Sequence, residues 1–217
     1  MITIGLTGGI GSGKSVVASL LEVYGIPVYV ADEESKRLLD APNPNRVSNP
    51  VRVEDQPVPN PIRVETSLLH ERLTALLGDA IYGPDGLNRR LMASLIFNDA
   101  RLLEQVNAII HPEVALHFQS WAERQSTKYV VLESAILFES NFNHWVDSCV
   151  MVYAPRELRI HRVMERDRVT EAEVWLRMQH QIPDEEKMEH ADYVIYNDEQ
   201  QALIPQVEKW KNNYLKI

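Results

Sequence analysis

Apolar residues along the chain follow two alternating patterns: short continuous runs, and stretches with the spacing of one helical face. Residues 2–7 form a β-rich run, a glycine-rich loop occupies 8–13, and residues 14–24 carry apolar side chains at helical spacing. A second apolar run at 26–30 closes at Asp32, and residues 33–39 have helical character. This strand–loop–helix–strand order predicts a parallel sheet with right-handed crossovers.

The rest of the chain continues the alternation. Continuous apolar runs at 129–132 and 149–153 predict strands buried on both faces, and 193–196 predicts a last short strand. Helices are predicted at 67–77, 87–97, 102–110, 113–124 and 200–214, with His111-Pro112 separating the third from the fourth and a turn at 78–86. A further helical stretch at 156–181 should break near Val169-Thr170. Together these elements predict a three-layer α/β fold.

The segment 41–65 breaks this pattern. It is dense in proline and repeats one unit three times, as Asn-Pro-Asn-Arg-Val at 43–47, Asn-Pro-Val-Arg-Val at 49–53 and Asn-Pro-Ile-Arg-Val at 60–64. Proline at this density argues against helix and interior strand. We expect an extended surface insertion without a catalytic role, and a partner-binding segment is the alternative.

Composition narrows the class of protein. With 217 residues, 45% of them hydrophobic and 24% charged, the chain is long and apolar enough to bury a sizeable core. A net charge of −9 argues against a general nucleic-acid binder. Cys149 is the only cysteine and suits a reducing compartment, and no apolar run reaches the length of a membrane span. The first apolar run lacks the features of a signal peptide, so a cytoplasmic protein is expected.

The loop at 8–15 carries the strongest chemical signal. Its sequence, Gly-Gly-Ile-Gly-Ser-Gly-Lys-Ser, fits G-x-x-x-x-G-K-[ST] without a mismatch. Glycines let backbone N–H groups converge on phosphates, and the following helix directs its N-terminal dipole at the same anion. Lys14 would reach the β- and γ-phosphates, and the Ser15 hydroxyl would bind Mg²⁺. We therefore predict an ATP site, whose expected contacts are Gly9, Ile10, Gly11, Ser12, Gly13, Lys14, Ser15 and Val16.

Among P-loop proteins, the sequence favours a small-molecule kinase. A guanine-reading N-K-x-D motif and a switch glycine, which a GTPase would need, are absent. A motor ATPase would normally carry a carboxylate at the end of an apolar strand and, in addition, a sensor or oligomer finger. Glu133 ends an apolar strand, so the motor ATPase class is weakened but stays open. Asp32 should lie beyond the carboxyl end of its strand, where ligands of parallel sheets gather. It would there accept the proton of an attacking hydroxyl, or it would cap the helix that follows, and the sequence alone leaves both open.

A cluster of arginines supports the same class. Five lie within thirteen residues, and three of them share one helical face. Phosphoryl transfer needs cations that close over the phosphates, which assigns Arg162 and Arg166 to a mobile lid. The alternative is a solvated face paired with neighbouring carboxylates. The full cluster is Arg156, Arg159, Arg162, Arg166 and Arg168, of which the first and last are expected to be surface charges.

The order of motifs resembles the dephospho-CoA kinase family. The resemblance begins with residues 4–15 and with Val30-Ala-Asp32. It continues in order through Asp85–Arg89, Ile110–Pro112, Ala135–Glu139, Arg162–Asp167, Arg177–Gln181, Lys187, Ala191-Asp192 and Asn197, over nearly the whole chain outside 41–65. The loop motif is generic to P-loop enzymes, but the ordered set is specific. Two departures are Glu133, where family members often carry Asp, and Ala135-Ile136, where they often carry Pro-Leu.

The resemblance implies ATP- and Mg²⁺-dependent phosphorylation of the ribose 3′-hydroxyl of dephospho-CoA, the last step of coenzyme A synthesis. It implies that Asp32 is the catalytic base and that Asn197 lies near the adenine of ATP. Arg89 and His111 join Asp32 as expected acceptor-binding residues, although His111 suits lobe packing as well. Glu133 would reach the metal through water. The implied partners are ATP and dephospho-CoA, without nucleic acid or membrane, and the oligomeric state is left open.

The expected organisation is one kinase domain. Its core comprises about 1–40, 126–155 and 190–217, with the proline-rich insertion at 41–65, a helical acceptor lobe at about 66–125 and the lid at about 156–182. Lengthening a surface loop costs only ~0.6 kcal/mol per doubling, so the insertion should be tolerated. Two alternatives stay open: another nucleotide or small-molecule kinase, and a nucleotide-binding regulator that recruits a partner through the proline-rich segment.

Overall fold

The computed structural model describes residues 1–40, 61–83, 86–97 and 99–215, with side chains from Leu68 onward in the second of these ranges. The chain divides into two compact units, one made of Met1–Ala31 and Trp121–Ile217 and the other of Asp32–Ser120. Predictions for residues 41–60 lie outside the described residues. No helix in the described ranges combines the length and the apolar character needed to span a membrane.

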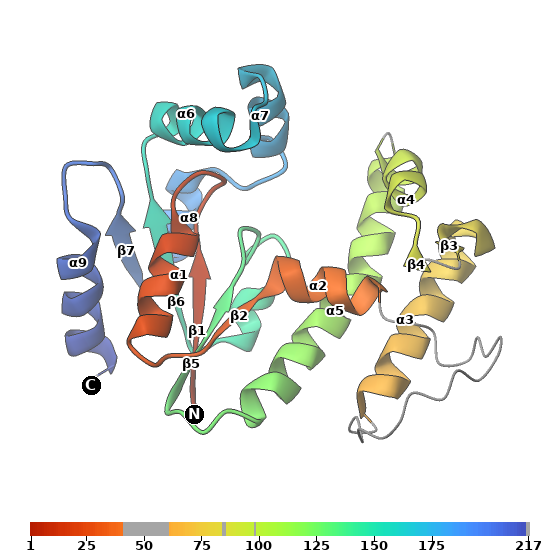
Figure 1. Cartoon of the computed structure of the whole chain (residues 1–217), viewed down its shortest axis with the longest axis horizontal. Helices are drawn as coiled ribbons and strands as arrows, with labels where there is room; N and C mark the ends of the chain where they lie inside the picture. The colour runs from red at the N-terminus through yellow and green to blue at the C-terminus, as the bar shows by residue number, and fades with distance from the viewer. Residues whose placement is uncertain (41–60, 84–85, 98, 216–217) are drawn as a thin grey trace. The chain divides into compact units, whose positions relative to one another are not determined.

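A five-stranded parallel sheet forms the centre of the first unit (Figure 1). Its strands, in spatial order, are β2 (Val28–Val30), β5 (Tyr129–Glu133), β1 (Ile2–Thr7), β6 (Ser148–Tyr153) and β7 (Tyr193–Tyr196). Every residue of β5 is buried, as its continuous apolar run predicted. Parallel pairing brings the carboxyl ends of all five strands to one edge, and the glycine-rich loop follows β1 at that edge. The predicted α/β fold is confirmed.

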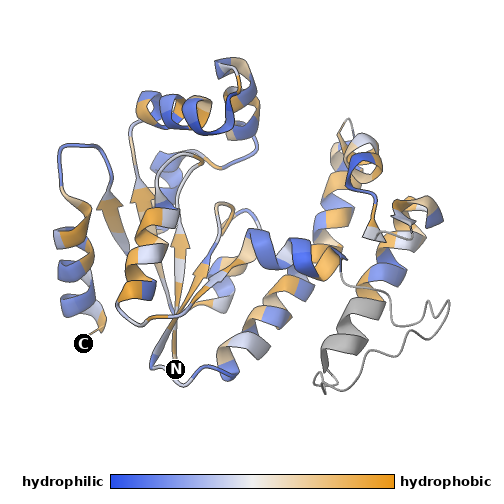
Figure 2. Cartoon of the chain, in the orientation of Figure 1, coloured by the Kyte–Doolittle hydropathy of each residue, from blue (hydrophilic) through white to orange (hydrophobic). Residues whose placement is uncertain are grey.

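Helices cover both faces of this sheet, and the strands are its most apolar part (Figure 2). Ile4 and Leu6 of β1 share a buried cluster with Val17 of α1 (Lys14–Val23) and Trp210 of α9 (Leu203–Trp210). Gly5 points to the opposite face, where an added Cβ would meet Leu137. On that face lie the segment after β5, with the short 3₁₀ helix η2 (Phe142–Trp145), and α8 (Asp184–His190), which packs against β6.

Two further helices follow β6. They are α6 (Arg156–Asp167) and α7 (Glu171–Met178), and the chain breaks between them where the sequence predicted. Arg168 ends α6 in the left-handed conformation, and Thr170 begins α7 with a capping box in which its side chain and that of Glu173 bond each other's backbone. The two helices share a small apolar core of their own, which consists of Ile160, Val163 and Val174.

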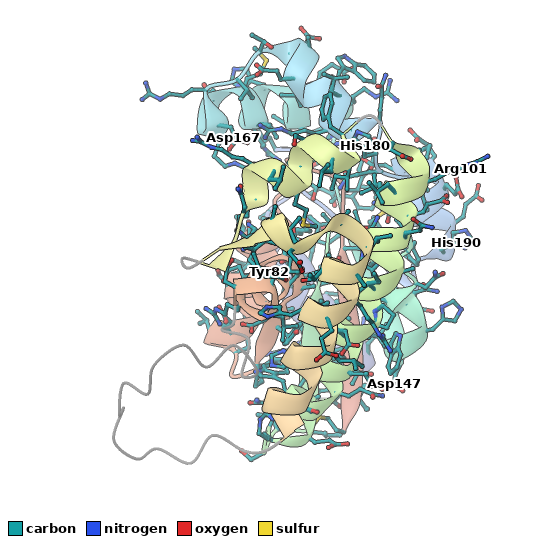
Figure 3. The ribbon with its side chains drawn as sticks, turned by 90° about the vertical axis from the view of Figure 1, so that its right-hand side faces the viewer. Tyr82, Arg101, Asp147, Asp167, His180 and His190 are labelled. Atoms are coloured by element: carbon teal, nitrogen blue, oxygen red, sulfur yellow. The ribbon has the colours of Figure 1, made fainter. Side chains whose placement is uncertain are left out.

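The second unit is mainly helical. Its elements are α2 (Ala31–Asp40), α3 (Pro61–Leu77), a 3₁₀ turn η1 (Asp79–Ile81), the hairpin of β3 (Tyr82–Gly83) and β4 (Gly86–Leu87), α4 (Arg89–Ile96) and α5 (Ala100–Glu123). Asn88 caps α4 by accepting a hydrogen bond from the Leu91 N–H. The centroids of the His70 ring and of the Tyr82 ring, the latter labelled in Figure 3, lie 4.1 Å apart. These contacts hold the hairpin against α3.

Several predicted boundaries were wrong. The helix expected from residue 67 begins at Pro61, because proline suits the first helical turn, where its missing N–H has no partner to lose. The expectation that 41–65 is wholly non-helical therefore fails for 61–65. The break predicted at His111-Pro112 is also wrong, because α5 runs through Pro112 while Ile110 and Val114 stay buried on its packed face. Helix α8 was not predicted, and the last helix is shorter than expected, ending at Trp210 before a π-helical turn at Lys211–Leu215.

Candidate active site

The glycine-rich loop ends at Lys14, which begins α1 at the carboxyl edge of the sheet. Its Nζ lies 3.1 Å from Oε1 of Glu133, the last residue of β5. Leu6 of β1 pairs in register with Glu133, so the two strands place the carboxylate beside the loop. Both side chains are largely shielded, at 16% and 8% exposed. A lysine held in this way is oriented before any phosphate binds.

Asn197, expected near adenine, contacts the loop itself. Its Nδ2 donates to the Ser12 carbonyl at 2.8 Å, and its backbone N–H donates to the carbonyl of Tyr153 at the end of β6. Gly13 lies in the left-handed region with φ of 88°, and a Cβ there would come within 2.1 Å of Asn197 Nδ2. Glycine at 13 is therefore required twice over, by its backbone conformation and by the asparagine packed against it.

A buried ion pair lies against the start of the loop. Arg159 Nη2 and Asp184 Oδ2 are 2.8 Å apart, and their side chains are only 8% and 7% exposed. Burial lowers the pKa of the Arg159 guanidinium and raises that of the Asp184 carboxyl, and the opposite charge of each partner counters both shifts. A Cβ at Gly9 would overlap Arg159 Nη1, at 1.7 Å, so this pair fills the space that a side chain at position 9 would need.

The predicted lid arginines differ in their surroundings. Arg162 is a quarter exposed, and it donates to the carbonyl of Asn197 at 3.2 Å and to Glu199 at 3.1 Å. Arg166 is 62% exposed and pairs with Asp167, labelled in Figure 3, which also binds Arg177. Arg162 is thus tied to the residue that holds the loop, whereas Arg166 shows the carboxylate pairing that the alternative interpretation expected.

The expected surface charges are both exposed. Arg156 lies over the ring of Trp175, with 5.3 Å from its guanidinium carbon to the ring centroid. Arg168 is the left-handed residue that ends α6. Neither contacts the loop through a described hydrogen bond or ion pair, which agrees with the prediction for them.

Asp32 lies in the first turn of α2 and is exposed. The helix begins one residue earlier, at Ala31, so the interpretation of Asp32 as the residue that caps it is wrong. Val30, two positions before Asp32, pairs in register with Glu133. The strand that leads to Asp32 therefore ends next to the strand whose carboxylate holds Lys14.

Arg89 and His111 lie in the second unit. Arg89 Nη2 binds Asp40 Oδ2 at 2.7 Å and the Lys36 carbonyl at 3.1 Å, so it fastens the end of α2 to the start of α4. His111 is partly buried within α5, and burial lowers the pKa of its ring. Both positions fit packing within this unit, and their acceptor-binding role stays a prediction.

The oxygen ligands near Lys14 suit a hard divalent cation. Mg²⁺ is typically held by one or two carboxylates, hydroxyls and the substrate's own phosphates. Ser15 follows Lys14 in the first turn of α1, and the Glu133 carboxylate lies 3.1 Å from the Lys14 ammonium. No group of three or more His, Cys, Asp or Glu side chains among the described residues is arranged to hold a metal by itself. The set therefore fits a cation that arrives with a nucleotide.

A cavity of about 370 Å³ lies elsewhere in the first unit. It is lined by Phe138, Ser148 and His190, among others, and Ser148 begins β6. No predicted site residue lines it.

Three residues that contact the loop were not singled out as site residues. Arg159 had been counted in the arginine cluster, but only the fold shows that it is buried. Asp184 stands in an acidic stretch that is typical of a solvent-facing helix, so no local signal marked it. Gln181 was noticed only within the family motif, and its Oε1 accepts the Ile10 N–H at 2.9 Å.

Comparisons with known proteins agree over almost the whole chain. A family model described as dephospho-CoA kinase matches residues 2–48 and 55–202. Only 49–54 interrupt the match, so most of the proline-rich segment lies within the matched ranges. The family match therefore extends into the segment 41–65, which the motif resemblance had left out.

Individual relatives point the same way. A protein from Bacteroides fragilis named dephospho-CoA kinase is 42% identical over 207 residues, which is 95% of this chain and 89% of that protein. One of the same name from Porphyromonas gingivalis is 38% identical over 208 residues, covering 95% and 91%. The solved structure of TT1252 from Thermus thermophilus is 31% identical, with a TM-score of 0.74, over 99% of this chain and 96% of that one.

Proposed function

The chain belongs to the dephospho-CoA kinase family, and we propose that it transfers the terminal phosphate of ATP to the ribose 3′-hydroxyl of dephospho-CoA. The products are ADP and coenzyme A. The observation that carries the proposal is the family match over nearly the whole chain, together with an intact phosphate loop whose Lys14 is held against Glu133.

The loop binds and orients the triphosphate. Its backbone N–H groups and the start of α1 face the phosphates, and Lys14 neutralises charge on the β- and γ-phosphates. Glu133 keeps the lysine directed along the edge of the sheet. Arg162 and Arg166 contribute further positive charge from α6 as the lid, and this charge counts most when the phosphoryl group is in transit.

Asp32 acts as the general base. Its carboxylate accepts the proton of the 3′-hydroxyl as the hydroxyl oxygen forms a bond to the γ-phosphorus and the bond to the β-γ bridging oxygen breaks. Its place directly after β2 supports this role, because Val30 pairs with Glu133 and β2 therefore ends beside the strand that holds Lys14. An exposed carboxylate also stays available to a substrate that enters from solvent. Arg89 and His111 belong to the unit that we assign to acceptor binding.

Ser15 and Glu133 are the residues that would hold Mg²⁺, the latter through water. When bound with ATP, the ion neutralises negative charge on the β- and γ-phosphates. The remaining steps, which are orientation of the triphosphate and removal of the hydroxyl proton, belong to side chains of the chain itself.

A panel of acceptors tests the proposal. The full-length protein is incubated with Mg-ATP and, separately, dephospho-CoA, nucleoside monophosphates, shikimate or no acceptor, and ADP release is measured. We expect acceptor-dependent turnover with dephospho-CoA alone, and a product phosphorylated on the ribose. Transfer to a monophosphate without transfer to dephospho-CoA would overturn the substrate. Tight ATP binding without turnover on any acceptor would favour a nucleotide-binding regulator.

A further inference from the structure

We propose that Gln181 is a positioning residue for the phosphate loop, and that it couples the shape of the loop at Ile10 to the segment that follows Glu133. The inference rests on the proposed function for the identity of the nucleotide. The contacts that carry it all lie within the first unit, and the experiment below separates the two claims.

The Gln181 side-chain amide bridges two pieces of backbone that are remote in sequence. Its Oε1 accepts the Ile10 N–H at 2.9 Å, and its Nε2 donates to the Ala135 carbonyl at 3.2 Å. Ala135 lies two residues after Glu133, the carboxylate that holds Lys14. One amide thus spans the gap between the middle of the loop and the segment that leaves β5, and it satisfies one polar group on each side.

The Ala135 end of this bridge is itself fixed. Lys187, which is fully buried, donates to the same carbonyl at 2.8 Å and pairs with Glu139 at 2.7 Å. Glu139 also accepts the backbone N–H of Ile182, the residue after Gln181, at 2.8 Å. A buried ammonium is stable only where it is paired and hydrogen-bonded, so this arrangement holds the segment rigidly. Gln181 therefore bonds to an immobile anchor.

The Ile10 end is held from other sides. The Ile10 side chain packs against the small core shared by α6 and α7, and the Arg159–Asp184 pair fills the space beside Gly9. Loop glycines alone would leave this stretch conformationally free. The surrounding contacts restrict that freedom, and the Gln181 bond acts directly on the peptide of Ile10.

The consequence concerns catalysis rather than folding alone. A loop that reaches its phosphate-binding shape before ATP arrives loses less conformational entropy on binding and holds the triphosphate in line with the acceptor. A shift of about 1 Å in such a site costs about a hundredfold in rate. Loss of the Gln181 bridge should therefore be felt in phosphoryl transfer even where the protein stays folded.

The test compares three variants with the wild-type chain. Gln181→Met keeps the length of the side chain and removes both hydrogen-bonding groups, whereas Gln181→Glu keeps the acceptor for Ile10 and loses the donor to Ala135. Gln179→Met is the matched control, because Gln179 is exposed two residues earlier. Hydrogen exchange at the Ile10 amide, ATP affinity by calorimetry, kcat and KM for ATP, and Tm are measured on each.

We expect Gln181→Met to speed exchange at Ile10 by about tenfold or more, since an amide without its partner opens freely. The kcat/KM for ATP should fall by about tenfold to a hundredfold. Gln181→Glu should keep Ile10 protected, and Gln179→Met should match the wild-type chain in all four measurements. These differences should persist well below each variant's Tm, where a purely structural defect would not show.

Two outcomes would overturn the proposal. One is unchanged exchange at Ile10 in Gln181→Met; the other is a kcat/KM within about twofold of the control, with only Tm lowered. Failure of the proposed function looks different. In that case the wild-type chain would not phosphorylate dephospho-CoA, while exchange at Ile10 would still respond to Gln181→Met.

Discussion

Two ion pairs, one from each unit, hold their charged side chains in different surroundings. In the first, Arg159 and Asp184 are 2.8 Å apart and less than a tenth exposed. In the second, Arg89 and Asp40 are 2.7 Å apart but 44% and 53% exposed. The two pairs have nearly equal N–O distances but different electrostatic surroundings, because water screens the second pair and is excluded from the first. The Arg159–Asp184 pair therefore holds buried charges beside the loop, whereas the Arg89–Asp40 pair joins two helices at the surface.

Substitution of Asp32 should give the largest loss of turnover, although this side chain is exposed. It is exposed, so Asp32→Asn should leave stability nearly unchanged. In its proposed role as general base, it should contribute about 10²–10⁴-fold to turnover while ATP affinity stays near the wild-type value. Steady-state kinetics and ATP calorimetry on the same preparation check this, and full turnover in the variant would refute the assignment.

The next effect sharpens the contrast between the two ion pairs. Asp184→Ala leaves the buried Arg159 without its partner and should cost about 3–5 kcal/mol of unfolding free energy. Arg89→Ala removes an exposed pair and should cost about 1 kcal/mol or less. Chemical denaturation of both variants gives the comparison, and Asp184→Asn, which keeps an oxygen for Arg159, is the control. Equal losses from the two alanine variants would show that the contrast in burial does not govern stability.

The two arginines that we propose for the lid should also differ in the effect of their loss on turnover, by smaller amounts. Arg162→Ala removes bonds to Asn197 and Glu199 next to the loop, and we expect kcat to fall by about tenfold to a hundredfold. Arg166→Ala removes an exposed pair with Asp167 and should cost less. In both, turnover should fall more than ground-state ATP affinity, as binding and kinetic measurements together would show. Equal losses in the two quantities would indicate plain ATP anchoring.

The smallest effect concerns Asp167. Hydrogen bonds from Arg166 and Arg177 lower the pKa of its carboxyl from 3.8 to about 2. A lowered pKa means that the carboxylate favours the folded state above about pH 4, and that this contribution disappears as the pH falls toward 2. Arg177→Ala should raise the pKa of Asp167 toward its ordinary value. NMR titration of the side chain measures it, with Arg168→Ala as the control.

Local patterns carried much of the prediction. The G-x-x-x-x-G-K-[ST] motif between an apolar run and an amphipathic stretch placed Lys14 and Ser15 correctly at the start of α1. The break between α6 and α7 and the bounds of β7 were also visible, because caps and apolar runs depend on neighbours in sequence. The prediction of a break at Pro112 was wrong because it, too, considered only neighbours in sequence. Its local preference is to end a helix, and only the packing of α5 outweighs that preference.

The sequence by itself determined the chemistry available to this protein: a phosphate loop, a strand-end aspartate and arginines at helical spacing. Tertiary structure alone decided which charges are buried and what they touch. Arg159 and Arg166 are the same residue type, seven positions apart on one helix, yet one is buried beside Gly9 and the other is exposed beside Asp167. Burial depends on contacts between segments remote in sequence, as between Gln181 and Ile10, and no local pattern encodes those contacts.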